Sequence, residues 1–115
     1  MRDALLYSAG FLGMALSLIH GWLGDSKVIH ALTAPHRVTQ RINRAVFHLS
    51  TIYWFVGGVA LLLAPLIGEP FRGPIAWAAA GMYCAGVVAN LWATRGRHFG
   101  AYALLIVAAL AVMGA

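Results

Sequence analysis

Charged side chains are scarce in this 115-residue chain: Asp, Glu, Lys and Arg make up only 10% of it, against about 25% in soluble domains. Acidic residues are the rarest, with three in all, and a single cysteine excludes an intramolecular disulfide. Charged residues are missing altogether from four runs: 4–24, 45–68, 73–94 and 98–115. These absences exclude a soluble enzyme, a disulfide-stabilised secreted domain and a disordered protein.

The four uncharged runs have the length and composition of transmembrane helices. A bilayer core about 30 Å thick needs roughly 20 helical residues to cross it, and the runs are 21, 24, 22 and 18 residues long. Stretches such as Val59–Ala64 are apolar without alternation, unlike the strands of a membrane barrel. We therefore predict an all-α integral membrane protein with one domain, 1–115. Its predicted spans are residues 4–23, 45–66, 74–93 and 99–115.

Short connections predict that neighbouring spans run antiparallel to each other. Prolines and glycines are concentrated between the second and third spans, and Pro74 suits the first position of the third helix. The connection between the third and fourth spans is tighter still, at Arg95–His98. The sequence therefore predicts a bundle of four antiparallel helices.

The first connection, 24–44, is longer and has a helical pattern of its own. Asp25–Ser26 is suited to cap a helix, and the apolar side chains between Val28 and Leu32 then share one face. Ala34–Pro35 interrupts this pattern. We expect a short helix in the membrane interface, followed by an N-terminal extension of the second span from about Arg37.

The basic residues are divided unequally between the two sides of the predicted bundle. Arg2 and Arg72 lie on the side of the termini, whereas six basic residues lie in the connections 24–44 and 94–98. Cytoplasmic loops are enriched in Lys and Arg. We therefore predict a multi-pass protein of a bacterial inner membrane, with these connections cytoplasmic and both termini outside. The pattern does not indicate nucleic-acid binding, because no aromatic residues interleave a basic patch. The six residues are Lys27, Arg37, Arg41, Arg44, Arg95 and Arg97.

Small residues on the first span predict close helix packing. Gly13, Ser17 and Gly21 recur every four residues, the spacing at which membrane helices approach one another closely. The pattern favours packing within the bundle, and self-association through the same face is the alternative.

All five histidines fall on the side of the six basic residues. His20 lies three residues before the end of the first span and His48 three residues after the start of the second. Each is thus about 4–5 Å below the same interface. Asn90 reaches a similar depth on the third span, so we expect these three side chains to meet, with His98 and Asp25 just outside. The other two histidines, His30 and His36, lie in the first connection.

Three interpretations of this histidine cluster stay open. In the first, His20, His48, His98 and Asp25 bind a transition metal, since imidazole and carboxylate are ligands of zinc, copper and iron. In the second, His20 and His48 hold a b-type haem between facing helices. In the third, backbone, water or lipid phosphate satisfies the histidines. Four arginines are placed to contact either haem propionates or lipid phosphates: Arg41, Arg44, Arg95 and Arg97.

The sequence offers no evident catalytic set. Ser17, Ser50 and Cys84 lack an evident base, and the three carboxylates are divided between the two sides, which argues against paired-carboxylate chemistry. We therefore expect a non-enzymatic accessory or assembly subunit of a larger membrane complex. Its partners would be the bilayer and other membrane subunits, or a second copy of the chain. The alternatives are a haem- or metal-binding redox protein, and a small transporter or channel lined by the face from His48 to Thr51.

Overall fold

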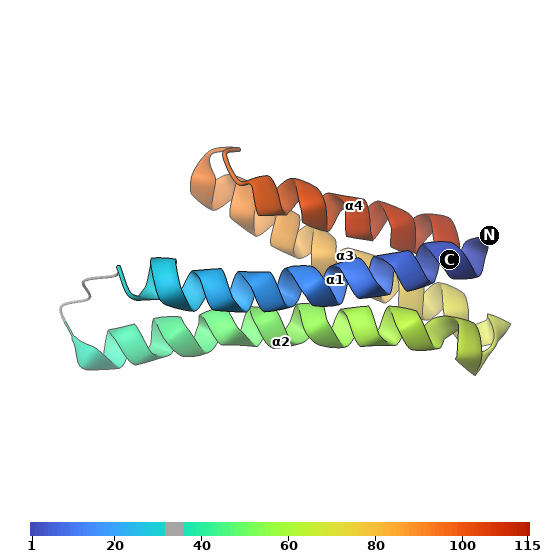
Figure 1. The fold of residues 1–115 in the computed structure, drawn as a ribbon, viewed down its shortest axis with the longest axis horizontal. Coiled ribbons are helices and arrows are strands. Elements are labelled where there is room, and N and C mark those ends of the chain that lie inside the picture. The colour runs from blue at the N-terminus through green and yellow to red at the C-terminus, as the bar shows by residue number, and fades with distance from the viewer. Residues whose placement is uncertain (32–35) are drawn as a thin grey trace.

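The residues that the structure describes form four long helices and one short helical segment (Figure 1). The computed structural model describes residues 1–31 and 36–115. Every regular element in these residues is helical, without a strand, which confirms the predicted all-α fold. The elements are α1 (Arg2–Leu23), the π-helical segment η1 (Gly24–Ile29), α2 (Arg37–Ile67), α3 (Glu69–Thr94) and α4 (Phe99–Gly114).

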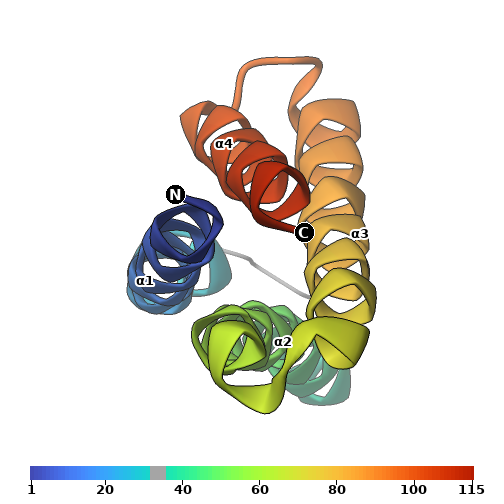
Figure 2. The same ribbon diagram turned by 90° about the vertical axis from the view of Figure 1, so that its right-hand side faces the viewer.

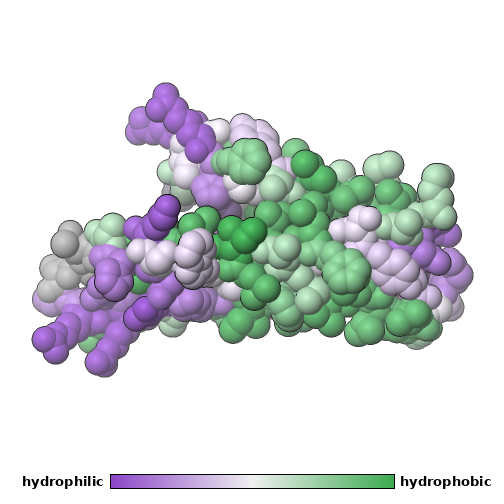
Figure 3. Space-filling model, viewed as in Figure 1, coloured by the Kyte–Doolittle hydropathy of each residue, from purple (hydrophilic) through white to green (hydrophobic). Residues whose placement is uncertain are grey.

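Three helical stretches of the described chain are long and apolar enough to cross a membrane. They are α1 continued by η1, then α2, and then α3, whereas α4 is apolar but has 16 residues. Figure 3 shows a broad hydrophobic belt between two polar ends. Large apolar side chains are exposed to the surroundings, among them Phe11, Val56 and Ile106. An exposed apolar surface of this extent fits a membrane protein.

Each helix packs against its neighbours in chain order, and α4 returns to pack against α1 (Figure 2). Neighbouring helices run in opposite directions along a bundle that measures 51 × 25 × 18 Å. The core takes residues from all four long helices. α1 and α2 approach closely where Gly10 meets Gly58, because a Cβ on either residue would lie 2.8 Å from the carbonyl oxygen of the other. The core includes Leu6, Leu61, Tyr83 and Val107.

The turn between α2 and α3 is much shorter than predicted. α2 ends at Ile67 and α3 begins at Glu69, so only Gly68 separates them. Gly68 has φ 114° and ψ 159°, a region essentially open only to glycine. Pro74, predicted to begin the third helix, instead lies inside it, and Pro70 occupies the first turn. A proline in the first turn, such as Pro70, loses no intrahelical hydrogen bond. Pro70 therefore marks the start of α3, and the prediction that Pro74 does so is wrong.

The first connection also differs from the prediction. η1 continues α1 directly, so a π-helical extension of the first helix takes the place of a separate interfacial helix. The expected cap at Asp25–Ser26 is wrong: the Ser26 hydroxyl donates to the Trp22 carbonyl at 2.7 Å, which keeps this residue within the helix. α2 begins at Arg37, as predicted. Leu32 and the predicted break at Ala34–Pro35 lie outside the described residues.

The end of the bundle that holds both termini and the α2–α3 turn is termed the terminal end (Figure 1). Its charges are paired. The Arg72 side chain is buried and lies 2.5 Å from Asp3 Oδ1 and 3.4 Å from Glu69 Oε1. Arg72 also donates to the Gly114 carbonyl at 3.0 Å. These contacts tie the start of α1, the start of α3 and the end of α4 together.

Candidate functional site at the basic end

The opposite end of the bundle is termed the basic end. It holds η1, the start of α2 and the α3–α4 turn (Figure 1), and Figure 3 shows hydrophilic side chains projecting from it. Only one acidic residue, Asp25, lies among its basic residues. The basic end therefore carries a strong positive excess, whereas the terminal end is balanced. Its basic residues are Lys27, Arg37, Arg41, Arg44, Arg95 and Arg97.

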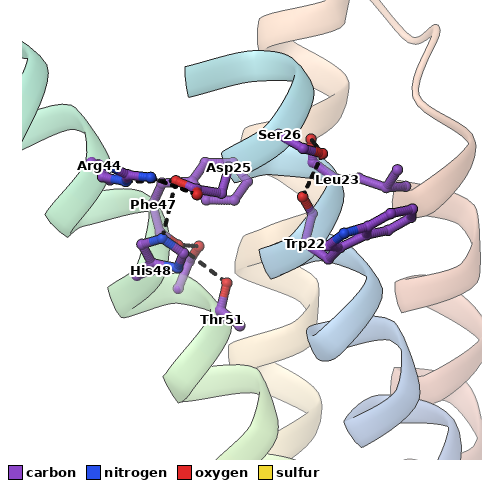
Figure 4. Close-up of polar contacts among 9 residues, drawn as sticks. Trp22, Leu23, Asp25, Ser26, Arg44, Phe47, His48 and Thr51 are labelled. Carbon is purple, nitrogen blue, oxygen red and sulfur yellow. Dashed lines mark hydrogen bonds and ion pairs between the residues drawn. The ribbon is translucent and has the colours of Figure 1, made fainter. Parts of the chain in front are cut away.

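Asp25 of η1 is held by two side chains of α2 (Figure 4). Arg44 Nε and Nη2 each donate a hydrogen bond of 2.6 Å, one to each carboxylate oxygen, and His48 Nε2 lies 3.4 Å from Oδ1. A bidentate pair of this kind is the most directional ion pair that proteins form. The Arg44 guanidinium holds the pKa of the Asp25 carboxyl below its usual value of 3.8. Both charged groups lie just outside the uncharged runs, so the pair joins η1 to α2 at the edge of the apolar belt.

His20, near the end of α1, lies in an aromatic cluster with two residues of α2. Its ring stacks on Phe47 with centroids 4.2 Å apart and an interplanar angle of 12°, and the tilted Trp54 ring lies 4.5 Å away. His20 Nε2 lies 3.3 Å from Ser50 Oγ, whose own proton is donated to the Phe47 carbonyl at 2.6 Å. Ser50 therefore serves as an acceptor for the imidazole.

Glycines bring the end of the first helix into direct contact with α2. A Cβ at Gly24 would lie 1.8 Å from Phe47 Cζ, and a Cβ at Gly21 would lie 2.9 Å from Thr51 Cγ2. The α2 face that bears Arg44, His48 and Thr51 is therefore packed against α1 and η1. In the predicted transporter, the face from His48 to Thr51 would instead line a pathway.

The other residues of the small-residue pattern are also buried. Gly13 lies against Tyr83, whose hydroxyl oxygen would be 2.2 Å from a Cβ added there. Ser17 donates to the Met14 carbonyl of its own helix at 2.7 Å. The pattern on α1 thus faces the interior of the bundle.

Toward the basic end, α3 and α4 diverge from α1 and α2 (Figure 1). A groove lies there between α1, η1, α2 and α3. It has a volume of about 710 Å³ and is lined mainly by apolar side chains of α2 and α3. On the α3 wall, Ala85, Ala89 and Ala93 recur every four residues. His20 and Asn90 both border the groove, as their predicted common depth suggested, whereas His48 does not. The lining residues are His20, Val28, Ile29, Asn43, Val46, Phe47, Ser50, Tyr53, Trp54, Met82, Ala85, Gly86, Ala89, Asn90 and Ala93.

A second hollow, termed the basic cavity, lies at the start of α2. Its volume is about 340 Å³. The buried side chain of Ile29 lines both the groove and the basic cavity, so the two are neighbours. The other lining residues are His30, Arg37, Gln40, Arg41 and Arg44.

The remaining predicted ligands do not join the His20 cluster through any hydrogen bond in the described chain. His98 caps α4, where its Nδ1 accepts a hydrogen bond of 3.1 Å from the Ala101 amide. Arg95 and Arg97 lie in the α3–α4 turn. Within residues 1–31 and 36–115, no group of three or more His, Cys, Asp or Glu side chains is placed to hold a metal ion. The metal and haem interpretations therefore stay predictions.

Phe47 and Ser50 organise this end, yet sequence reasoning gave them no binding role. The available signal was Gly21 and Gly24, one helical turn apart at the end of the first span, which indicates a bulky partner side chain without naming it. Comparison of the chain with protein-family models, with curated proteins and with solved structures finds no match.

Proposed function

We propose that this chain is a non-enzymatic membrane protein that acts as an accessory subunit. In this proposal the groove receives a transmembrane helix of a partner protein. The observation that carries the proposal is the groove itself, which is lined by residues of α1, η1, α2 and α3.

The α3 wall of the groove supports a helix as the occupant. Ala85, Ala89 and Ala93 follow the four-residue spacing that lets two helix backbones approach closely in a membrane. His20 and Asn90 border the same groove and offer polar atoms to the occupant. Hydrogen bonds between helices contribute about 0.6 kcal/mol each in membranes, which suits a specific but reversible contact.

The chemistry of the described side chains supports a binding role over catalysis. The Ser50 hydroxyl donates its hydrogen bond to the Phe47 carbonyl. The Asp25 carboxylate is paired with Arg44 and lies close to His48. The other two carboxylates, Asp3 and Glu69, pair with arginines at the terminal end. A nucleophile, a base and an orienting group are therefore not assembled in one place.

A photo-crosslinking amino acid placed at position 89 tests the proposal in native membranes. Ala89 borders the groove, whereas Val88 is exposed on the same helix outside it and serves as the matched control. We expect one polypeptide to be crosslinked from position 89 and not from position 88. The same polypeptide should copurify with the unmodified chain in a fixed ratio in mild detergent.

Two outcomes would overturn this function. One is a chain that always purifies alone and gives no crosslink from position 89. The other is equal crosslinking from positions 88 and 89, because random collisions in the bilayer do not distinguish the groove from the outer face of α3.

The proposed orientation puts the basic end in the cytoplasm of a bacterial cell, with both termini on the other side. The distribution of basic residues supports this orientation, because six lie at the basic end and two at the terminal end, and cytoplasmic loops are enriched in Lys and Arg. A reporter enzyme that is active only outside the cytoplasm, fused after Ala115, should be active. Activity of a cytoplasm-only reporter at the same place would reverse the orientation.

The haem, metal and transport alternatives stay predictions with a simple test for each. In the haem alternative, His20 Nε2 and His48 Nε2 would have to leave Ser50 and Asp25 respectively. An optical spectrum and a metal analysis of the purified, folded protein decide that question. Uptake by liposomes that depends on His48 would favour transport.

A further inference from the structure

We propose that the basic cavity binds the phosphate headgroup of an anionic phospholipid from the leaflet on its side of the membrane. The site consists of Arg37, Gln40 and Arg41 of α2, with His30 opposite them and Ile29 at its apolar boundary. This proposal is independent of the partner helix in the groove.

The first argument is the charge left over at this end. Asp25 is the single carboxylate of the basic end, and Arg44 already occupies both of its oxygens at 2.6 Å. Arg37 and Arg41 form no ion pair within the described residues. Arg37 and Arg41, one helical turn apart, therefore line one cavity without a carboxylate partner among the residues that the structure describes. Guanidinium groups bind phosphate oxygens in a bidentate manner.

The second argument is the depth of the cavity. It lies at residues 37–44, directly before the uncharged run 45–68 begins. A ligand there sits at the level of lipid headgroups. The groove, which shares Ile29 with the cavity, lies on its apolar side.

The third argument is the amphipathic character of the start of α2. Val38, Ile42 and Val46 are exposed and follow a four-residue spacing beside the arginine face. Arginines on one side and exposed aliphatic side chains on the other suit the boundary between headgroups and acyl chains. A bound lipid can thus place its phosphate on Arg37 and Arg41 while its acyl chains cover the aliphatic stripe. Free phosphate would make no use of that stripe.

The test compares two double variants of equal charge in phosphatidylcholine vesicles that contain phosphatidylglycerol. Arg37→Gln with Arg41→Gln alters the cavity, and Arg95→Gln with Arg97→Gln removes the same charge from the α3–α4 turn at the same end. The sequence alone also placed Arg95 and Arg97 near lipid phosphates, but in the structure they line neither the basic cavity nor the groove, so the proposed site does not include them. Native mass spectrometry of the released protein counts retained phosphatidylglycerol. We expect the cavity variant to retain about tenfold less phosphatidylglycerol than the wild type. The turn variant should retain less than the wild type by no more than about twofold.

Each other outcome of this test overturns the proposal. Equal losses in the two variants mean that the arginines act only through general surface charge. If the lipid-free protein in detergent binds inorganic phosphate, the ligand is a soluble anion and not a phospholipid. The Arg37→Lys, Arg41→Lys variant guards against misfolding, since it keeps the charge but not the guanidinium geometry. It should retain an intermediate amount of lipid, and full retention would overturn a site that depends on guanidinium geometry, because charge alone would then suffice.

These outcomes are distinguishable from failure of the proposed function. The cavity variants leave the groove wall at Ala85, Ala89 and Ala93 unchanged. Crosslinking from position 89 should therefore persist in the Arg37→Gln, Arg41→Gln protein.

Discussion

Gly24 of η1 lies against the tip of the Phe47 ring on α2, at a distance that leaves no room for even one methyl group: an added Cβ would lie 1.8 Å from Cζ and 1.9 Å from Cε1. The same phenyl ring also stacks on the imidazole ring of His20. Movement of Phe47 would therefore disturb the aromatic cluster and the groove that it borders.

Gly24→Ala should destabilise the protein by about 1–3 kcal/mol, because overpacking must displace the Phe47 ring. Gly81→Ala is the matched control, since an added Cβ there meets no atom within 4 Å, and it should be neutral or stabilising by up to about 1 kcal/mol. Thermal unfolding in mild detergent measures both. Equal melting temperatures for the two variants would contradict the packing of Gly24 on Phe47. Adding Phe47→Leu to Gly24→Ala should restore part of the loss.

The Asp25–Arg44 pair should give stability that depends on pH in one direction. Arg44 lowers the pKa of the Asp25 carboxyl from 3.8, so the folded protein holds the charged form more strongly than the unfolded chain. The contribution is present above pH 3.8 and is lost as the pH falls through the lowered pKa. Melting temperatures of the wild type and Asp25→Asn should thus differ at neutral pH and converge in acid. A difference that grows toward low pH would have the wrong sign.

Tyr83→Phe should cost about 1 kcal/mol, since the buried hydroxyl donates a hydrogen bond of 2.7 Å to the Trp54 carbonyl and links α3 to α2. Tyr102→Phe provides the comparison, because its hydroxyl makes an exposed bond to the Gly96 carbonyl at 3.1 Å. We expect that second change to be close to neutral. Reversible unfolding in detergent and denaturant reports both values, and a larger effect at Tyr102 would place the important contact elsewhere.

Arg72→Gln should loosen the terminal end. The Arg72 side chain is 7% exposed and serves Asp3, Glu69 and the Gly114 carbonyl at once, so its loss leaves several groups without a partner. We expect a cost of about 2 kcal/mol. Arg2→Gln, at 51% exposure, should cost less than about 1 kcal/mol. Faster proteolysis of the Arg72→Gln protein near its ends is an independent readout, and equal stability of the two variants would argue against the buried network.

The approximate ends of the helices could be predicted from the sequence, because charged residues flank the uncharged runs. The unequal division of basic residues indicated the basic end, and the uncharged runs located the four long helices to within several residues. The prolines were less informative. Proline is tolerated in the first turn of a helix, so the choice between Pro70 and Pro74 as a helix start required the three-dimensional structure.

Rotation of the helices about their axes was harder to predict than depth. His20, His48 and Asn90 have similar depth, yet His48 turns toward Asp25 while His20 and Asn90 border the groove. The Phe47 ring contacts both histidines: it stacks on the His20 ring, and its centroid lies 6.3 Å from that of the His48 ring in an edge-on arrangement. Sequence spacing relates residues on one helix, but contacts between helices depend on how two faces fit together.

Gly68 is the single residue that separates α2 from α3, so it sets the angle at which α3 leaves the turn. α3 has 26 residues and is therefore about 39 Å long. A rotation of about 5° at Gly68 would move the far end of α3 by about 3 Å, and that far end is the wall of the groove. Any such rotation would first have to break the packing of α3 on α2, including the bond from the Tyr83 hydroxyl to the Trp54 carbonyl, before it widened the groove at the basic end of the bundle.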